Sequence, residues 1–147
     1  MPEDPYADPV TGVLRNKLGL STTGELESAE REITHAALIF LKESPVQPSY
    51  DLRHLCTIHR RVFGDTYDWA GQLRTVAIAK ETWFCLPQYI ESAAAKVFRA
   101  LHGESLLRGL SREVFCWPLI PAGAEANEHF RAHHPEDYGG AVNRPRD

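Results

Sequence analysis

Three histidines in the last part of the chain have a spacing that could bind a metal ion. His129, His133 and His134 stand at i, i+4 and i+5, a spacing that can turn imidazoles toward one metal ion on a helix face. Pro135 follows directly, and no other obvious ligand stands beside them. The pattern therefore favours solvated histidines, and no metal site is predicted.

Three carboxylates in the middle of the chain could be interpreted as a pair for general acid–base catalysis. Asp65 and Asp68 lie in a segment rich in turn-forming residues, and Glu81 follows a short strand-like pattern. Aspartate is also one of the usual residues that cap a turn with the side chain. A turn cap and surface charges are the favoured interpretation.

Composition narrows the class of protein. The 147 residues fit one domain, and a net charge of −4 gives no support for general binding of nucleic acid. No apolar run approaches the roughly 20 residues that span a bilayer, and the acidic start lacks the features of a signal peptide. Cys56, Cys85 and Cys116 form no CxxC pair and are predicted to be buried thiols. We expect a cytoplasmic protein without membrane association.

Helices must position any functional side chains, and two are predicted in the first half. Thr22 and Glu25 form a capping box that begins the first helix, which ends before Pro45. The second is predicted over residues 51–63, with Leu55 on its buried face. Replacing a buried leucine by alanine costs roughly 2–4 kcal/mol, and this is the loss expected for Leu55→Ala.

A hairpin and two more helices are predicted further on. Residues 73–78 alternate apolar and polar side chains as a strand does, and Trp83 and Phe84 are the predicted return. A third helix is predicted over residues 87–103, and a fourth begins after Ser111. Prolines interrupt the fourth helix, and after it the periodicity is lost.

Four strings, in order along the chain, resemble the Fic family. They are residues 6–19, 55–64, 67–76 and 105–115. The third, YDWAGQLRTV, is similar to the family's WAGxxR turn and is the most specific. The resemblance implies an all-α, mainly helical Fic fold with a small β-hairpin flap. It also implies a protein adenylyltransferase, which transfers AMP from ATP to a hydroxyl of a target protein.

The family's chemistry is carried by the motif HxFx(D/E)GNGRxxR, of which this chain lacks an intact copy. The resemblance implies ATP with Mg²⁺, the histidine acting as general base. The best counterpart is AEANEHFR at residues 124–131. There His129 is the candidate catalytic base and Arg131 the candidate nucleotide-binding residue, a solvated histidine being the alternative for His129. Without the glycines the backbone cannot wrap the phosphates, so we expect impaired or absent activity and an incomplete C-terminal part.

The resemblance also assigns a role to the predicted hairpin, which falls on the family's flap. In the family the flap holds the target's backbone beside the active site and can touch the nucleotide. The flap residues here are Lys80, Glu81, Thr82, Trp83 and Phe84. A plain hairpin is the alternative, and Trp69 and Arg74 are predicted to be structural, with Arg74 tying the flap to the core.

Control of the family often comes from a helix bearing [S/T]xxxE[G/N]. Residues 21–25 begin like this motif, but Leu26 stands where Gly or Asn is expected. The resemblance therefore implies that any inhibitor is a separate, antitoxin-like protein. The protein substrate is not identified by the sequence.

Two other interpretations stay open beside the enzyme. One is a non-catalytic module that uses the flap to bind an extended peptide by strand addition. The other is the product of a frame-shifted pseudogene that never folds stably. The predicted division is an extended lead-in at residues 1–20, a Fic-like helical core at 21–117, and a degenerate active-site region with a mobile tail at 118–147.

Overall fold

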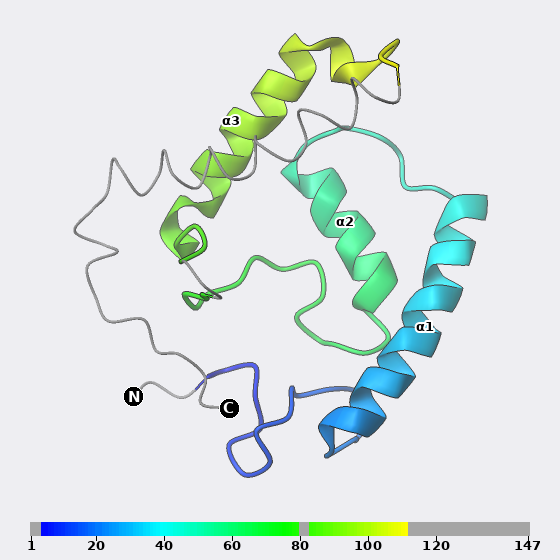
Figure 1. Cartoon of the computed structure of the whole chain (residues 1–147), viewed down its shortest axis with the longest axis vertical. Helices are drawn as coiled ribbons and strands as arrows, with labels where there is room; N and C mark the ends of the chain where they lie inside the picture. The colour runs from blue at the N-terminus through cyan, green and yellow to red at the C-terminus, as the bar shows by residue number, and fades with distance from the viewer. Residues whose placement is uncertain (1–3, 80–82, 112–147) are drawn as a thin grey trace. The chain divides into compact units, whose positions relative to one another are not determined.

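Three α-helices make up most of the regular structure in residues 4–79 and 83–111, the part of the chain that the computed structural model describes (Figure 1). They are α1 (Thr23–Glu43), α2 (Leu52–Phe63) and α3 (Ile90–Gly103), with the short 3-10 helices η1 (Pro87–Tyr89) and η2 (Ser105–Leu107). The chain divides into two compact units, Met1–Leu73 and Arg74–Asp147. The predominance of helix among the described residues agrees with the sequence prediction.

The start of α1 is the predicted capping box. Thr22 is extended, its hydroxyl accepts a hydrogen bond from the Glu25 amide at 3.4 Å, and the same hydroxyl donates to the Glu25 carboxylate at 2.6 Å. These contacts satisfy an amide that has no partner inside the helix. The helix ends at Glu43, just before Pro45, as predicted.

The start of α2 is fixed by an aspartate. The Asp51 carboxylate accepts from the Ser49 hydroxyl at 2.7 Å and from the His54 amide at 2.8 Å. These two donors, the Ser49 hydroxyl first, hold the pKa of Asp51 below its ordinary value. The helix then runs to Phe63, which confirms the predicted span of residues 51–63.

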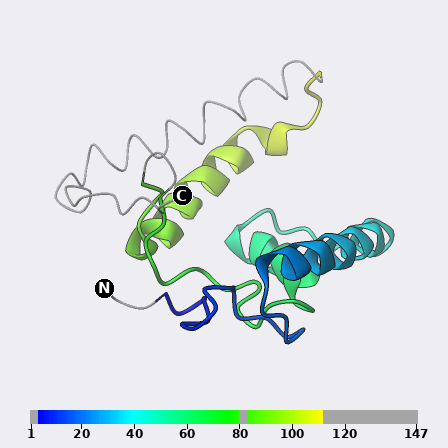
Figure 2. The ribbon, with the colours of Figure 1, turned by 60° about the horizontal axis from the view of Figure 1, so that its bottom comes forward.

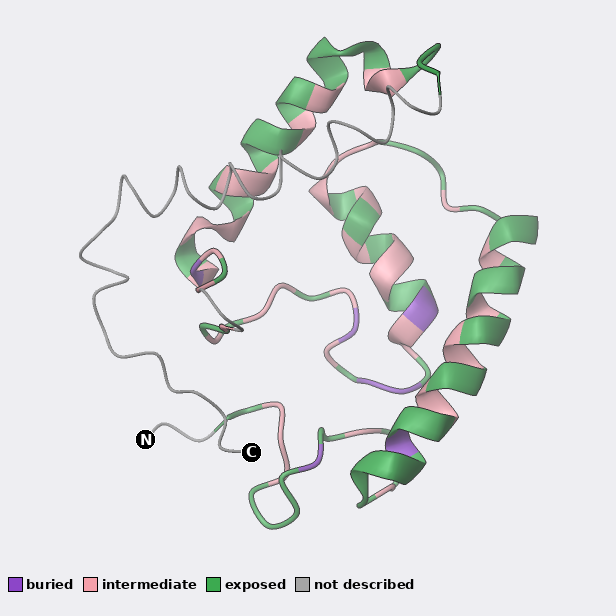
Figure 3. Ribbon diagram, viewed as in Figure 1, coloured by how far each residue is buried: buried purple, intermediate pink, exposed green. Residues whose placement is uncertain are grey.

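The helices α1 and α2 lie side by side in both views of the first unit (Figures 1 and 2). Their buried residues gather where the beginning of α1 meets the end of α2 (Figure 3). The core cluster consists of Val13, Leu26, Tyr67 and Ala70, with Leu20, Phe63 and Trp69 packed against it. The core therefore draws on the loops before α1 and after α2 as much as on the helices.

The prediction that Leu55 is a core residue is wrong. Its side chain is 54% exposed, whereas Val62, seven residues later on the same face of α2, is 7% exposed. The loop after α2 approaches this helix at Cys56 and Arg60, next to Gly71, and Leu55 stays exposed. An amphipathic pattern identifies the apolar face of a helix, but burial also requires another element over that face.

The segment before α1 is anchored by a tight turn. The Asp8 carboxylate accepts from the amides of Thr11 and Val10, which hold its pKa below the ordinary value. An antiparallel bridge joins Ala7 to Leu14, and Val13 is buried in the core. This segment contributes directly to the first unit.

In the second unit, Pro87 opens η1 and α3 follows to Gly103, which confirms the predicted third helix. No helix within the described ranges is long and apolar enough to cross a membrane. The predicted fourth helix after Ser111 and the region 118–147 lie outside the described residues.

The uneven burial of the two helices predicts different costs for two matched substitutions. Leu26→Ala should lower the free energy of unfolding by about 2–4 kcal/mol, because Leu26 is only 5% exposed. Leu55→Ala should change it by about 0.5 kcal/mol or less, as at other exposed positions. Urea denaturation of the two variants measures both values. Equal losses would contradict the position of the core.

Candidate functional site

The hairpin at residues 76–85 is the first part of the candidate site. Ala79 and Trp83 form an antiparallel bridge, and the Phe84 amide donates to the Ile78 carbonyl at 3.0 Å. This pairing lies where the sequence predicted a hairpin. Of the predicted flap residues, Trp83 and Phe84 are described, whereas Lys80, Glu81 and Thr82 lie outside the described ranges.

Arg74 ties the two arms of this hairpin together. Its guanidinium donates to the Val76 carbonyl at 2.7 Å on one arm and to the Cys85 carbonyl on the other. The rigid fork of a guanidinium suits such paired acceptors. The sequence predicted that Arg74 ties the flap to the core. Its two carbonyl partners are instead on the hairpin itself, so Arg74 fixes the hairpin's base.

Two apolar side chains face solvent on the hairpin. Ile78 is 44% exposed and Phe84 is 48% exposed, and the hydrogen bond between their backbones places them opposite one another. Opposed side chains on one face of a strand pair are close enough to act as one surface.

At the base of the hairpin, burial raises the pKa of the Cys85 thiol, which therefore stays protonated near neutral pH.

The turn at residues 66–72, the most specific part of the resemblance, is built on aromatic contacts in the first unit. Tyr67 stacks on Trp69 with ring centroids 4.5 Å apart, and Tyr6 meets Trp69 edge-on at 5.7 Å. Such pairs add roughly 0.5–1.5 kcal/mol beyond the burial of their area. Trp69 thus has structural contacts of the kind the sequence predicted.

The turn requires a glycine at position 71. Its φ is +79°, and a Cβ atom there would lie 2.7 Å from the Cys56 carbonyl oxygen. The Gly71 amide donates to His59 Nδ1 at 3.0 Å, which ties the turn to α2. The role of His59 was missed in the sequence, where it was noted only as a neighbour of the apolar face of its helix.

Tyr67 connects the turn to α1. Its hydroxyl donates to the Glu30 carboxylate, and its side chain is only 2% exposed. Burial, followed by the Glu30 contact, raises the pKa of the Tyr67 phenol. A buried phenol bonded to a carboxylate keeps its proton, so the turn and α1 are joined by a charge-assisted hydrogen bond.

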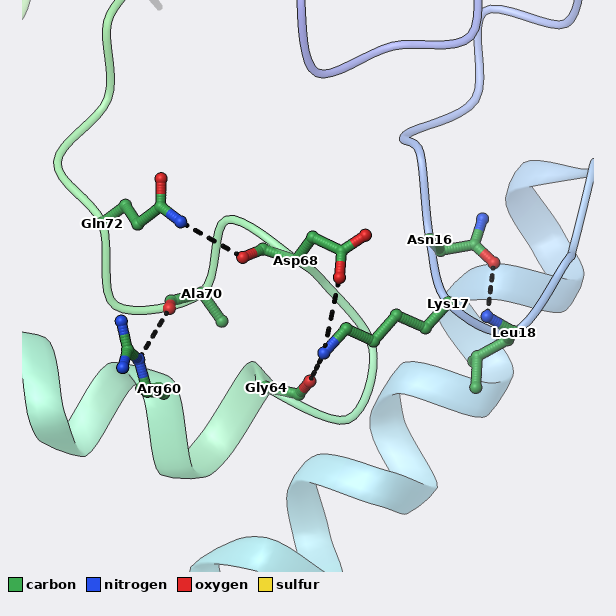
Figure 4. A network of polar contacts seen from close by, with 8 residues as sticks. All are labelled: Asn16, Lys17, Leu18, Arg60, Gly64, Asp68, Ala70 and Gln72. Atoms are coloured by element: carbon green, nitrogen blue, oxygen red, sulfur yellow. Dashed lines mark hydrogen bonds and ion pairs between the residues drawn. The ribbon is translucent and has the colours of Figure 1, made fainter.

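The carboxylates of the turn have structural partners or face solvent. Lys17 Nζ lies 3.6 Å from Asp68 Oδ1 and donates to the Gly64 carbonyl at 2.7 Å (Figure 4). Because the Asp68 side chain is 91% exposed, this ion pair contributes little to stability. Within residues 4–79 and 83–111, no three His, Cys, Asp or Glu side chains gather as a metal site requires.

Arginines on α2 carry more hydrogen bonds than a purely solvated helix face would. Arg60 Nε donates to the Ala70 carbonyl of the turn at 3.4 Å, and Arg61 donates to the Ser44 carbonyl after α1 at 2.8 Å. Both side chains remain exposed. The two residues predicted for the chemistry itself, His129 and Arg131, lie outside the described part of the chain.

No family model matches the chain. Individual relatives, however, assign it to a family. It is 36% identical over 140 residues to the Salmonella typhimurium protein named "Probable protein adenylyltransferase Fic", covering 95% of this chain and 67% of that protein. It is 38% identical over 113 residues to protein adenylyltransferase VbhT of Bartonella schoenbuchensis, covering 76% of this chain and 24% of VbhT. The chain thus spans only about a quarter of the length of VbhT.

Solved structures agree on the fold. The N-terminal Fic domain of an effector protein from Bartonella sp. AR 15-3 has a TM-score of 0.69 at 23% identity, over 91% of this chain and 72% of that one. A Bartonella quintana Fic domain with bound ADP has a TM-score of 0.71 at 21% identity, over 96% and 71%. The chain therefore has the mainly helical Fic fold, which confirms the predicted fold class. Together with the relatives above, this places the chain in the Fic adenylyltransferase family.

The geometry of Gly71 predicts a large effect from a single methyl group. Gly71→Ala should cost about 2–4 kcal/mol of stability, because it combines a positive φ with a close approach to backbone. Gly24 is a matched control, since it lies in α1 and a Cβ there meets nothing within 4 Å. Gly24→Ala should stabilise by about 0.5–1 kcal/mol. Thermal denaturation compares the two, and a neutral Gly71→Ala would contradict the described turn.

The raised pKa of Tyr67 predicts a loss of stability in alkali. The folded state favours the protonated phenol, so its contribution is complete below the ordinary tyrosine pKa of about 10 and is lost as the pH rises above it. Tyr67→Phe removes this pH-dependent contribution, so the stability of the variant should fall less steeply than that of the wild type over the same pH range. Urea midpoints measured at pH 8 and above test the difference. Parallel curves for both proteins would contradict it.

Proposed function

We propose that this chain is a Fic domain whose reaction class is the transfer of AMP from ATP to a protein hydroxyl, and that this activity is impaired in the chain itself. The proposal rests on the 36% identity over 140 residues to a protein named as an adenylyltransferase, a match that covers 95% of the chain. The impairment rests on the string at residues 124–131, which is not followed by acid-Gly-Asn-Gly.

ATP is the nucleotide proposed for the reaction class, and this chain is proposed to have lost most of its affinity for it. A solved Fic domain from Bartonella quintana holds ADP, and the BepC protein from Bartonella tribocorum holds AMPPNP, which supports an adenine nucleotide for the family. The family's Mg²⁺ is held by the acidic residue of its motif, and its phosphates by the glycines that follow. The string after His129 has neither that acidic residue nor those glycines at the required place. The residues present do not fit the metal nucleotide.

His129 and Arg131 are proposed as remnants of the catalytic base and of a phosphate contact. A histidine alone can still accept a proton from a target hydroxyl. It cannot replace the backbone amides that stabilise the charge developing on the phosphate, which commonly provide the largest single contribution to catalysis. Residual activity in this chain is therefore expected to be very low.

The hairpin is proposed as the element that receives the target protein. Arg74 holds the base of the two arms, so the arms present a fixed edge to an extended segment of the target. The exposed pair of Ile78 and Phe84 offers an apolar contact beside that edge. Strand addition of this kind obtains affinity from main-chain hydrogen bonds and selectivity from alternate side chains.

A second candidate function uses the same hairpin without catalysis. A non-catalytic module that binds an extended peptide would require the fixed hairpin and its exposed apolar pair, and would not require a phosphate loop. The Arg74 contacts favour this candidate, since they fix a binding edge whether or not nucleotide is present.

Inhibition by a separate, antitoxin-like protein is also proposed. The segment that most resembles an inhibitory motif ends at Glu25, and the Glu25 carboxylate is bonded to the Thr22 hydroxyl at the start of α1. A glutamate used as a helix cap is held away from a role at a nucleotide. The cytoplasmic location stays a prediction from the sequence.

Labelling with ATP carrying a radioactive α-phosphate tests the proposed function. The purified chain with Mg²⁺ should give no label on itself or on lysate proteins above background. A chimera in which residues 124–147 are replaced by the matching part of the Salmonella relative, continued to that protein's end, should gain label. Loss of that label when the restored motif histidine becomes alanine is the control.

Two results would contradict the proposal. Strong label from the unmodified chain that disappears in His129→Ala would show that the activity is intact. A chimera that folds with a cooperative melt but stays without label would show that residues 1–123 do not form an adenylyltransferase core.

A further inference from the structure

The first arm of the hairpin keeps a free strand edge. The Phe84 amide donates to the Ile78 carbonyl, so these two residues face each other as a hydrogen-bonded pair. The bridge between Ala79 and Trp83 is then a pair of the other kind, whose N–H and C=O groups point away from the partner strand. Among the described residues, no hydrogen-bond partner meets the backbone of Ala79. Its N–H and C=O groups are therefore open to an added strand.

The two faces of the hairpin differ in exposure. Ile78 and Phe84 are 44% and 48% exposed on one face, whereas Ala79 and Trp83 on the other face are half-buried. A strand added at the free edge would place one of its side chains next to Ile78, in a row with Phe84. β-branched and aromatic side chains gain most from such rows. The edge therefore suits an extended segment with an apolar side chain at that position.

None of these features depends on a nucleotide. Arg74 holds the base of the hairpin through carbonyls on the hairpin's own two arms, and the free edge consists of main chain. The impairment proposed above concerns another part of the sequence, after His129, where the motif's acid and glycines are missing. Loss of AMP transfer therefore leaves the binding surface of the hairpin in place.

We propose that the chain shields a target protein from adenylylation, because it occupies the extended segment that an active Fic domain with this hairpin would modify. This inference rests on the proposed function, since it takes the hairpin as the element that receives the target. The segment is defined by its chemistry: an extended backbone, an apolar side chain next to Ile78, and a hydroxyl that can accept AMP. While its main chain pairs with this hairpin, the segment is not available to the hairpin of an active enzyme.

Competition with the chimera that carries the Salmonella relative's motif tests the proposal, because the chimera and the chain have the same hairpin. The chimera labels lysate proteins with ATP carrying a radioactive α-phosphate, and the unmodified chain is added in excess. Once the target is saturated, an excess of about tenfold should lower the initial rate of labelling by about the same factor. Ile78→Glu places a charge in the apolar row and should abolish the competition. Ile78→Val keeps a branched apolar side chain and should compete like the wild type.

Val97→Glu is the matched control, because Val97 is 50% exposed on α3, outside the hairpin. It should compete like the wild type. Cooperative melts show that each variant is folded, and Phe84→Glu replaces Ile78→Glu if the latter does not melt cooperatively.

Three results would overturn the proposal. If the chimera labels lysate proteins at the same rate with and without excess chain, the shielding role is wrong and the proposed function stands. Equal competition by the wild type and Ile78→Glu would show that the hairpin does not carry the binding. A folded chimera that gives no label would contradict the proposed function, and the shielding role with it.

Discussion

The Tyr67 hydroxyl donates to Glu30 of α1, while the Gly71 amide donates to His59 of α2. These two hydrogen bonds hold the turn at residues 66–72 against both helices of the first unit, and the core forms around it. Tyr67 and Ala70 of the turn pack with Leu26 of α1 in the core cluster. Removal of the turn would leave α1 and α2 with their exposed apolar faces and without the closed end of their shared core.

A single cation has the corresponding role in the second unit. Arg74 bonds a carbonyl on each arm of the hairpin at residues 76–85, next to the Phe84–Ile78 backbone hydrogen bond and the Ala79–Trp83 bridge. Isolated two-stranded hairpins are marginal in water, so a charged clamp at the base contributes much of the order. The turn and the hairpin therefore each depend on a few polar contacts.

Sequence patterns predicted what is local and left out what depends on distant partners. The cap at Thr22, the span of α2 and the start of α3 follow from neighbouring residues, and all three were predicted correctly. The exposure of Leu55 depends on which element covers α2, and the His59–Gly71 bond joins residues twelve apart, so neither is visible in periodicity. The hairpin pairing was predicted from alternation, whereas the candidate base His129 lies outside the described ranges and stays a prediction.

The chain belongs to the Fic family, and we propose that its grip on nucleotide phosphates is lost. Isothermal titration calorimetry of the full chain with ATP and Mg²⁺ measures that grip without requiring a target protein. We predict no saturable heat up to millimolar ATP, because no glycine loop follows His129 to present its amides to the phosphates. Saturable binding of one ATP per chain with a micromolar dissociation constant would contradict the account.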